Sequence, residues 1–162
     1  MGMQYDVKSF HATGSSLAYA ARTRLKGVVI SPTTSTTYNT AVLDTAGSLT
    51  GTYNIPGSTT CTVTIANHGL SNGARVALDF TSGSAVDDCY VVANVSTNTF
   101  TVTTASLTTN GNVTMYPNIL TEIDCSSGTS FYTLLPGEGI LAKEGLFCLV
   151  PNSVVTMTVF YG

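Results

Sequence analysis

Hydrophobic and polar residues alternate in short runs along most of this chain, and turn-forming residues separate the runs. A period of two places the apolar side chains on one face of a strand. Outside the middle of the chain, the pattern predicts strands within residues 23–31, 36–45, 48–55, 119–126, 130–136, 140–150 and 154–161. Only residues 15–22 have a composition that suits a helix, and this segment is short. We therefore expect an all-β fold.

The middle of the chain, residues 59–116, carries its own train of short alternating strands, with turn signals such as Asn72-Gly73 and Asn110-Gly111. Loop signals at Pro56-Gly57-Ser58 and at Pro117 bound this segment. The outer segments supply about seven strands, a number that suits an antiparallel β-sandwich. The expected architecture is therefore a discontinuous β-sandwich over residues 24–58 and 117–162, interrupted by a small inserted β-barrel or roll over residues 59–116.

Residues 1–23 precede the first predicted strand and are expected to form a separate N-terminal arm. Four of the six basic residues lie within the first 26 positions, among several aromatic residues. One interpretation is a solvated lead-in to the first strand. The other is a docking arm, because aromatic and arginine side chains are enriched at protein interfaces. The candidate docking residues are Tyr5, Phe10, Tyr19, Arg22 and Arg24.

Charged residues make up only 9% of the chain, compared with about 25% in a typical soluble domain. This composition suits either a protein that is docked onto a larger assembly or a neutral secreted or structural β-protein. The net charge of −3 and the absence of an aromatic and basic stripe argue against a nucleic-acid partner. No apolar segment resembles a signal peptide or a membrane span, so we expect no membrane partner.

The sequence contains no recognisable catalytic or metal-binding motif. The four cysteines, Cys61, Cys89, Cys125 and Cys148, are widely spaced and form no CxxC pair, so we expect four buried, reduced thiols and no zinc site. The chain has two histidines and no nucleophile motif around any serine. We therefore expect a protein that is not an enzyme and that uses no cofactor.

Two loops of the middle segment could bind a ligand. His68 lies in the turn ANHGLSNG, where its first interpretation is structural, capping the turn or packing on Leu70. The acidic cluster of Asp79, Asp87 and Asp88 is first interpreted as a solvated loop. Shallow sugar sites use such polar loop residues, although the absence of Trp weakens a carbohydrate-binding interpretation. The candidate ligand residues are Asn67, His68, Asn72, Asp87 and Asp88.

The middle segment resembles a β-module of tailed-bacteriophage virion proteins. The resemblance lies in the turn N-H-G-L-x-x-G at residues 67–73, a Gly-Ser loop and the strand T-N-T-F-T-V at residues 97–102. The flanking segments RLKGVVIS (residues 24–31) and LPGEGILAKEGLFCLVPNSVVTMTVFYG (residues 135–162) resemble a small virion structural protein of marine short-tailed phages, including cyanophages.

This resemblance implies a non-enzymatic β-protein of the virion, made in the bacterial host cytoplasm and assembled on the outer surface of the particle. A capsid decoration or knob protein is the first expectation, because the sequence has no heptads or fibrous repeats. Alternatives are a tail or head-fibre subunit and a glycan-binding adhesin module. The expected partners are the major capsid protein or other virion proteins, further copies of this chain, or host surface glycans.

Overall fold

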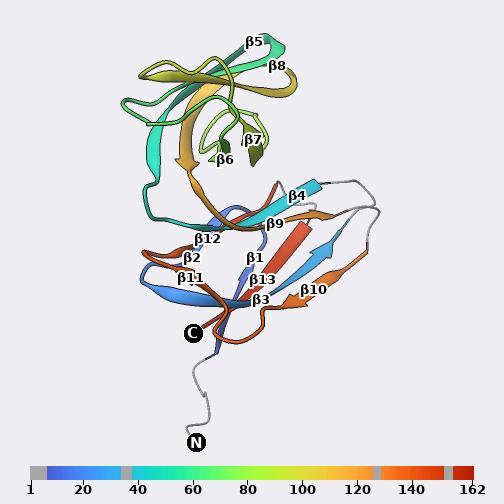
Figure 1. The fold of residues 1–162 in the computed structure, drawn as a ribbon. Helices are drawn as coiled ribbons and strands as arrows, with labels where there is room; N and C mark the ends of the chain where they lie inside the picture. The colour runs from blue at the N-terminus through green and yellow to red at the C-terminus, as the bar shows by residue number, and fades with distance from the viewer. Residues whose placement is uncertain (1–6, 34–37, 126–128, 152–154) are drawn as a thin grey trace, which may run out of the picture. The chain divides into compact units, whose positions relative to one another are not determined.

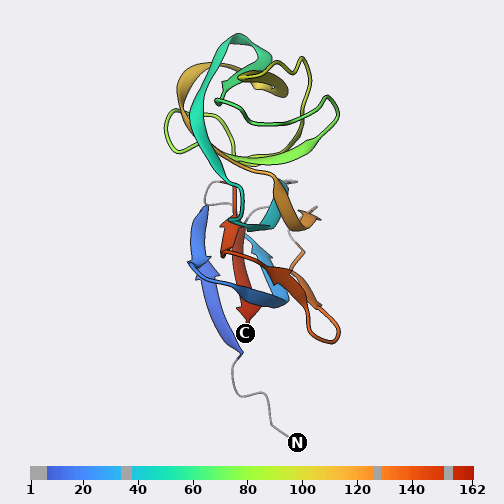
Figure 2. The same cartoon turned by 60° about the vertical axis from the view of Figure 1, so that its left-hand side comes forward.

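The computed structural model describes residues 7–33, 38–125, 129–151 and 155–162. The described residues form thirteen strands and no helix, which confirms the prediction of an all-β fold with antiparallel sheets. The strands belong to two compact units (Figures 1 and 2). Unit 1 consists of residues 1–46 and 120–162, and unit 2 consists of residues 47–119.

Unit 1 contains two antiparallel sheets. The first has the order β1-β13-β3-β10, with β11 also paired to β3, and the second has the order β2-β12-β4-β9. The bounds of these strands are β1 (Lys8–Ala12), β2 (Ser16–Tyr19), β3 (Thr23–Pro32), β4 (Tyr38–Asp44), β9 (Asn118–Cys125), β10 (Phe131–Leu134), β11 (Ile140–Ala142), β12 (Leu146–Leu149) and β13 (Val155–Tyr161). Figure 1 shows β13 beside β1 and β3.

The core of unit 1 follows from the alternation in its central strands. Every second residue of β13, from Val155 to Tyr161, is buried. These side chains share one apolar cluster with Leu25, Val28 and Ile30 of β3 and with residues of the second sheet such as Leu146. Burial of apolar area stabilises such a cluster by about 25 cal/mol per Å². The strongly alternating C-terminal strand is therefore a central strand, as its pattern predicts.

Unit 2 is one rolled sheet in the order β5-β8-β6-β7 (Figure 2). Its strands are β5 (Leu49–Thr64), β6 (Arg75–Asp79), β7 (Asp88–Val91) and β8 (Thr99–Tyr116). Just after β7, Ala93 forms an isolated antiparallel bridge with Thr101 of β8. The long strands β5 and β8 therefore bend around a second core, which contains Ile55, Val63 and Phe100.

The predicted boundary at Pro56-Gly57-Ser58 is wrong, because this tripeptide lies within β5. Pro56 pairs with Thr108, and the register shifts between Pro56 and Ser58 and again between Ser58 and Thr60. Such bulges accommodate a proline, which has no N–H to donate to a neighbouring strand. The two units instead divide at Ala46 and Gly47 and at Ile119 and Leu120.

The prediction of a separate arm over residues 1–23 is wrong for residues 8–19, and so is the helical interpretation of residues 15–22. β1 pairs with β13, and β2 pairs with β12. Both segments are therefore edge strands of the two sheets in unit 1. A short segment has little helix stability of its own, so pairing with an open sheet edge decides its conformation. Tyr5 lies outside the described residues.

Candidate functional site

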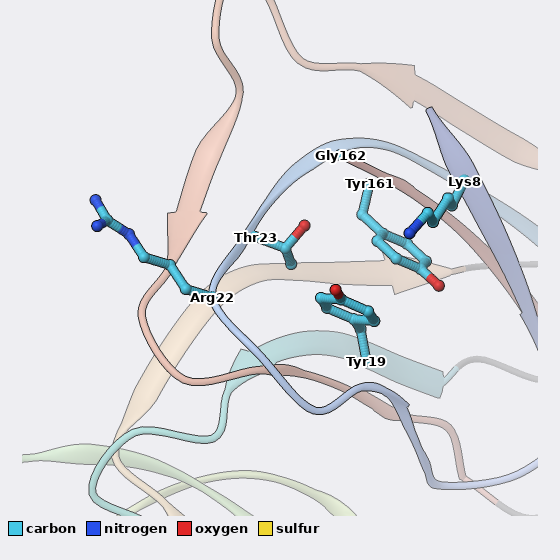
Figure 3. Close-up of a pocket in the computed structure, with 6 residues that line it drawn as sticks. All are labelled: Lys8, Tyr19, Arg22, Thr23, Tyr161 and Gly162. Atoms are coloured by element: carbon cyan, nitrogen blue, oxygen red, sulfur yellow. The ribbon is translucent and has the colours of Figure 1, made fainter. Parts of the chain in front are cut away.

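Unit 1 contains a half-open pocket with a volume of about 350 Å³, which we call the basic pocket (Figure 3). Its lining residues are Lys8, Tyr19, Arg22, Thr23, Tyr161 and Gly162. They come from the start of β1, the end of β2, the connection to β3 and the end of β13. Both sheets of unit 1 therefore contribute to this pocket.

Strand pairing brings these distant residues together. Lys8 is the direct partner of Tyr161 in the β1–β13 register. The backbone groups of Gly162 and Arg24 exchange two hydrogen bonds of 3.1 and 3.2 Å, which hold the end of β13 beside the start of β3. The rings of Tyr19 and Tyr161 have centroids 5.1 Å apart and planes inclined by 35°. The aromatic wall of the pocket is thus fixed by contacts across the two sheets.

The basic pocket is lined by two cationic residues and by no acidic side chain. The Nζ atom of Lys8 lies 5.6 Å from the centroid of the Tyr19 ring, within the range of a cation–π interaction. Figure 3 shows the guanidinium of Arg22 directed away from the two tyrosine rings. Over the described residues, neither Lys8 nor Arg22 forms an ion pair. The positive charge of this pocket is therefore not neutralised by neighbouring side chains.

Two of the side chains that line the pocket are mostly buried, but their hydroxyl groups can still form hydrogen bonds with a ligand or with water. Thr23 and Tyr161 are each 8% exposed. Within the described ranges, neither hydroxyl makes a hydrogen bond, and neither is enclosed away from solvent. Figure 3 shows Tyr161 beside the amine of Lys8, and Thr23 on the other side of the Tyr19 ring. The pocket therefore presents an ammonium group and several hydroxyl donors to one small space.

The structure brings together two of the predicted docking residues, Tyr19 and Arg22, in this pocket. Phe10 lies on β1 and packs against the core of unit 1. Arg24 lies on β3, where its guanidinium donates a hydrogen bond of 3.4 Å to the carbonyl of Gly139. Tyr161 belongs to no motif that marks it as a candidate docking residue in the sequence. Its only signal was the strong alternation of the last strand, which does not reveal the partner strand.

Unit 2 contains a second pocket of about 320 Å³, which we call the loop pocket. It includes two of the predicted ligand residues, Asn67 and His68, and its lining is Asn67, His68, Gly69, Leu70, Ser96 and Thr97. Asn67 has a positive φ of 51°, a conformation that asparagine adopts more readily than most residues. Its backbone nitrogen donates a hydrogen bond of 3.0 Å to the side chain of Asn98.

His68 stabilises the turn that forms the loop pocket. Its Nδ1 atom accepts a hydrogen bond of 3.1 Å from the backbone nitrogen of Leu70. Its ring contacts Phe100 in an edge-to-face arrangement, with centroids 5.1 Å apart. The imidazole is 7% exposed, and its Nε2 atom is enclosed without a hydrogen-bond partner among the described residues. His68 therefore caps the turn, in line with the structural interpretation of its sequence.

The other three predicted ligand residues lie outside the loop pocket and bind backbone groups. The Oδ1 atom of Asn72 accepts a hydrogen bond of 3.0 Å from the nitrogen of Val95. Asp87 accepts one of 2.8 Å from Phe80, and Asp88 accepts one of 2.7 Å from Cys89. The three side chains therefore stabilise backbone segments of unit 2.

The titratable groups of unit 2 include a carboxyl pair and buried thiols. Burial, the charge of Asp87 and a hydrogen bond with Asp87 raise the pKa of Asp79 to about 6.

All four cysteines of the chain are buried, and no disulfide joins any of them. Burial raises the pKa of Cys61 to about 11. In the described parts of the chain, no group of three or more His, Cys, Asp or Glu side chains is placed to hold a metal ion.

The described residues include no helix that is long and apolar enough to cross a membrane. No protein-family model matches this chain, and no match to a curated protein was found.

Proposed function

We propose that this chain is a non-enzymatic structural protein of a tailed-phage virion, most simply a decoration or knob protein on the outer capsid surface. In this proposal, unit 1 docks onto the protein shell and unit 2 is the displayed module. The observation that carries the proposal is the basic pocket of unit 1. It joins Tyr19 and Arg22 with Lys8 and Tyr161 on a chain that is otherwise poor in charge.

These residue types support a docking role. Tyrosine and arginine are enriched among the residues that dominate binding energy at protein interfaces. Tyr161 and Thr23 are held by the central strands of unit 1, so the pocket is preorganised and little conformational entropy is lost on binding. The resemblance of both outer and middle segments to phage virion proteins supports the same assignment.

Binding to particles tests this proposal. Particles that lack the chain are mixed with the purified protein and sedimented, and the bound protein is quantified. We expect the wild-type protein to sediment with the particles. The Lys8→Glu/Arg22→Glu variant should stay in solution, because its pocket carries two negative charges in place of the two positive charges that the proposed contact uses. Lys143→Glu is the matched control, since Lys143 is an exposed lysine of unit 1 that does not line the pocket. Equal binding by all three proteins would overturn the docking role of the pocket.

Deleting residues 1–23 is not a suitable test of docking. The deletion removes β1 and β2, which pair with β13 and β12. Loss of particle binding would then follow from damage to both sheets of unit 1. The charge-reversal variants avoid this problem because Lys8 and Arg22 are exposed.

The loop pocket favours a second candidate function, glycan binding by unit 2. Asn67, Ser96 and Thr97 place polar groups beside Leu70 in one concave site, and shallow combinations of polar and apolar groups suit sugars. A glycan array probed with the isolated protein tests this candidate. Binding that is lost in Thr97→Val and kept in Thr108→Val, a threonine of β8 that does not line the pocket, supports it. A protein that docks and does nothing else gives no hits.

A further inference from the structure

We propose that strand β10 pairs with β10 of a second copy of this chain, so that two copies form a symmetric dimer through the open edge of one sheet. β10 (Phe131–Leu134) ends the path β1-β13-β3-β10, and no other described strand pairs with its outer side. Figure 1 shows it beside β3 in unit 1. An open edge presents unpaired N–H and C=O groups that a further strand can use. The dimer depends neither on the proposed virion function nor on the basic pocket.

β10 lacks the charges that protect many sheet edges. Natural edge strands avoid pairing with other chains by carrying lysine or other charged side chains. The opposite edge of the same sheet, β1, carries Lys8, and the end strand β9 of the second sheet carries Glu122. The four residues of β10 carry no charge, and Phe131, Tyr132 and Leu134 are 43%, 75% and 75% exposed. This uncharged, apolar edge is suited to contact with another strand.

The register of β10 with β3 determines which backbone groups face outwards. Just after β10, the nitrogen of Leu135 donates a hydrogen bond of 2.8 Å to the carbonyl of Lys26 in β3. Hydrogen-bonded pairs alternate along an antiparallel ladder, so the backbone groups of Thr133, two positions earlier, also face β3. The N–H and C=O groups of Tyr132 and Leu134 therefore point to the open side of the strand.

A second copy of β10 fits this edge because the sequence around Thr133 is symmetric in character. Residues 131–135 read Phe-Tyr-Thr-Leu-Leu, with two apolar residues on each side of Thr133. When two copies meet antiparallel with Thr133 facing Thr133, Tyr132 of each copy faces Leu134 of the other. These two residues can then exchange both of their outward backbone hydrogen bonds on each side of the two-fold axis. Apolar side chains also face each other across the strands, and the two threonines form a further stabilising cross-strand pair.

The charge around this edge also favours a second copy. Two identical surfaces repel each other when both carry the same charge, but residues 129–137 contain no charged residue. The electrostatic cost of self-association is therefore small. One short strand provides less contact area than a standard protein interface of about 1,600 Å². We therefore expect a weak dimer, with a dissociation constant of about 100 μM.

Sedimentation equilibrium of the full chain, from about 10 μM to about 1 mM, tests the inference. We expect the wild-type protein to change from monomer to dimer over this range. Tyr132→Lys should weaken association by about tenfold or more, because it replaces two cross-strand pairs and adds a positive charge to each copy. Tyr132→Lys/Leu134→Glu should associate more tightly than Tyr132→Lys, because opposite charges face each other in this antiparallel register. Leu17→Lys is the matched control in β2, an edge strand of the other sheet, and should leave association unchanged.

Amide hydrogen exchange of the wild-type protein gives a second measurement that needs no variant. The N–H of Thr133 faces β3 and should exchange slowly at every concentration. Those of Tyr132 and Leu134 should exchange rapidly in dilute protein and about fivefold more slowly at about 1 mM, where most of the chain is dimeric.

Four outcomes would overturn the inference. The first three are a wild-type protein that stays monomeric, a Tyr132→Lys variant that associates like the wild type, and a Tyr132→Lys/Leu134→Glu variant that associates no more tightly than Tyr132→Lys. The fourth is a wild-type dimer in which exchange at Tyr132 and Leu134 does not slow, because its contact would then lie elsewhere. These measurements use no particles, so a negative result leaves the proposed docking role untouched.

Discussion

The carboxylate of Asp44 accepts a hydrogen bond of 2.7 Å from the backbone nitrogen of Lys143, 99 positions further along the chain. It accepts two more, of 3.1 Å from Ala46 and 3.2 Å from Glu144. Burial by itself would raise the pKa of Asp44, but the backbone donors outweigh burial and lower it. One ionised side chain thus connects the end of β4 to the turn between β11 and β12.

Replacing this carboxylate should destabilise unit 1. In Asp44→Asn, at least one buried N–H group loses its charged acceptor, and we expect the free energy of unfolding to fall by about 1–3 kcal/mol. Urea unfolding at pH 7, followed by circular dichroism, measures this change. Glu138→Gln, in an exposed turn of unit 1, is the control and should be neutral. An unchanged midpoint for Asp44→Asn would contradict this role.

The same carboxylate predicts how stability depends on pH. The pKa of Asp44 is lower in the folded than in the unfolded chain, so its contribution is present above the unfolded pKa of about 4 and is lost as pH falls through the folded pKa. Urea unfolding between pH 2 and pH 6 should show a smaller loss of stability in Asp44→Asn than in the wild type. Parallel curves for the two proteins would refute this prediction.

Asp79 should have the opposite effect on unit 2. Its pKa is raised to about 6 by burial, by the charge of Asp87 and by their hydrogen bond. Its stabilising contribution is therefore fully present below the unfolded pKa of about 4 and is lost as pH rises through about 6. We expect Asp79→Asn to raise the free energy of unfolding at pH 8 by about 1 kcal/mol, after allowance for solvent screening. Unfolding curves at pH 4 and pH 8 measure this difference, and a destabilised variant at pH 8 would argue against the carboxyl pair.

Tyr53 is expected to hold the turn after β6 through its hydroxyl group. The hydroxyl donates a hydrogen bond of 2.9 Å to the carbonyl of Ser82 and lies 3.3 Å from the hydroxyl of Thr109. Tyr53→Phe leaves a part-buried carbonyl with one partner fewer, so we expect a loss of about 1–2 kcal/mol in urea unfolding. Tyr132→Phe is the matched control, because Tyr132 is 75% exposed. Equal stability of both variants would show that the Tyr53 bond contributes nothing.

The cysteines should be unreactive in the folded protein. Burial raises the pKa of Cys148 to about 12 and that of Cys61 to about 11, and the thiolate is the reactive form. We expect no rapid reaction with a thiol-specific disulfide reagent at pH 8 and reaction of all four thiols in 6 M guanidinium chloride. Rapid labelling of any cysteine in the native protein would reveal an exposed thiol that the fold does not account for.

The local pattern of the sequence was sufficient to predict several features of the structure. The alternation over residues 155–161 predicts a central strand, and β13 is one. The turn around His68 predicts a structural role, either capping the turn or packing on Leu70, and the bond from the Leu70 nitrogen shows the capping role. The pattern was misleading at Pro56-Gly57-Ser58, where two bulges let a single strand continue through a typical loop signal.

The sequence by itself determined that this protein is all-β, because a period of two reports which face of each strand is apolar. Only the tertiary structure decided which strands pair. Lys8 lies beside Tyr161 because β1 covers the edge of β13, and a period of two carries no information about the partner of a strand. The basic pocket depends on this pairing of the first described strand with the last. Tyr19 and Arg22 could therefore be identified as candidate docking residues from their chemistry, whereas the pocket that unites them with Lys8 and Tyr161 could not.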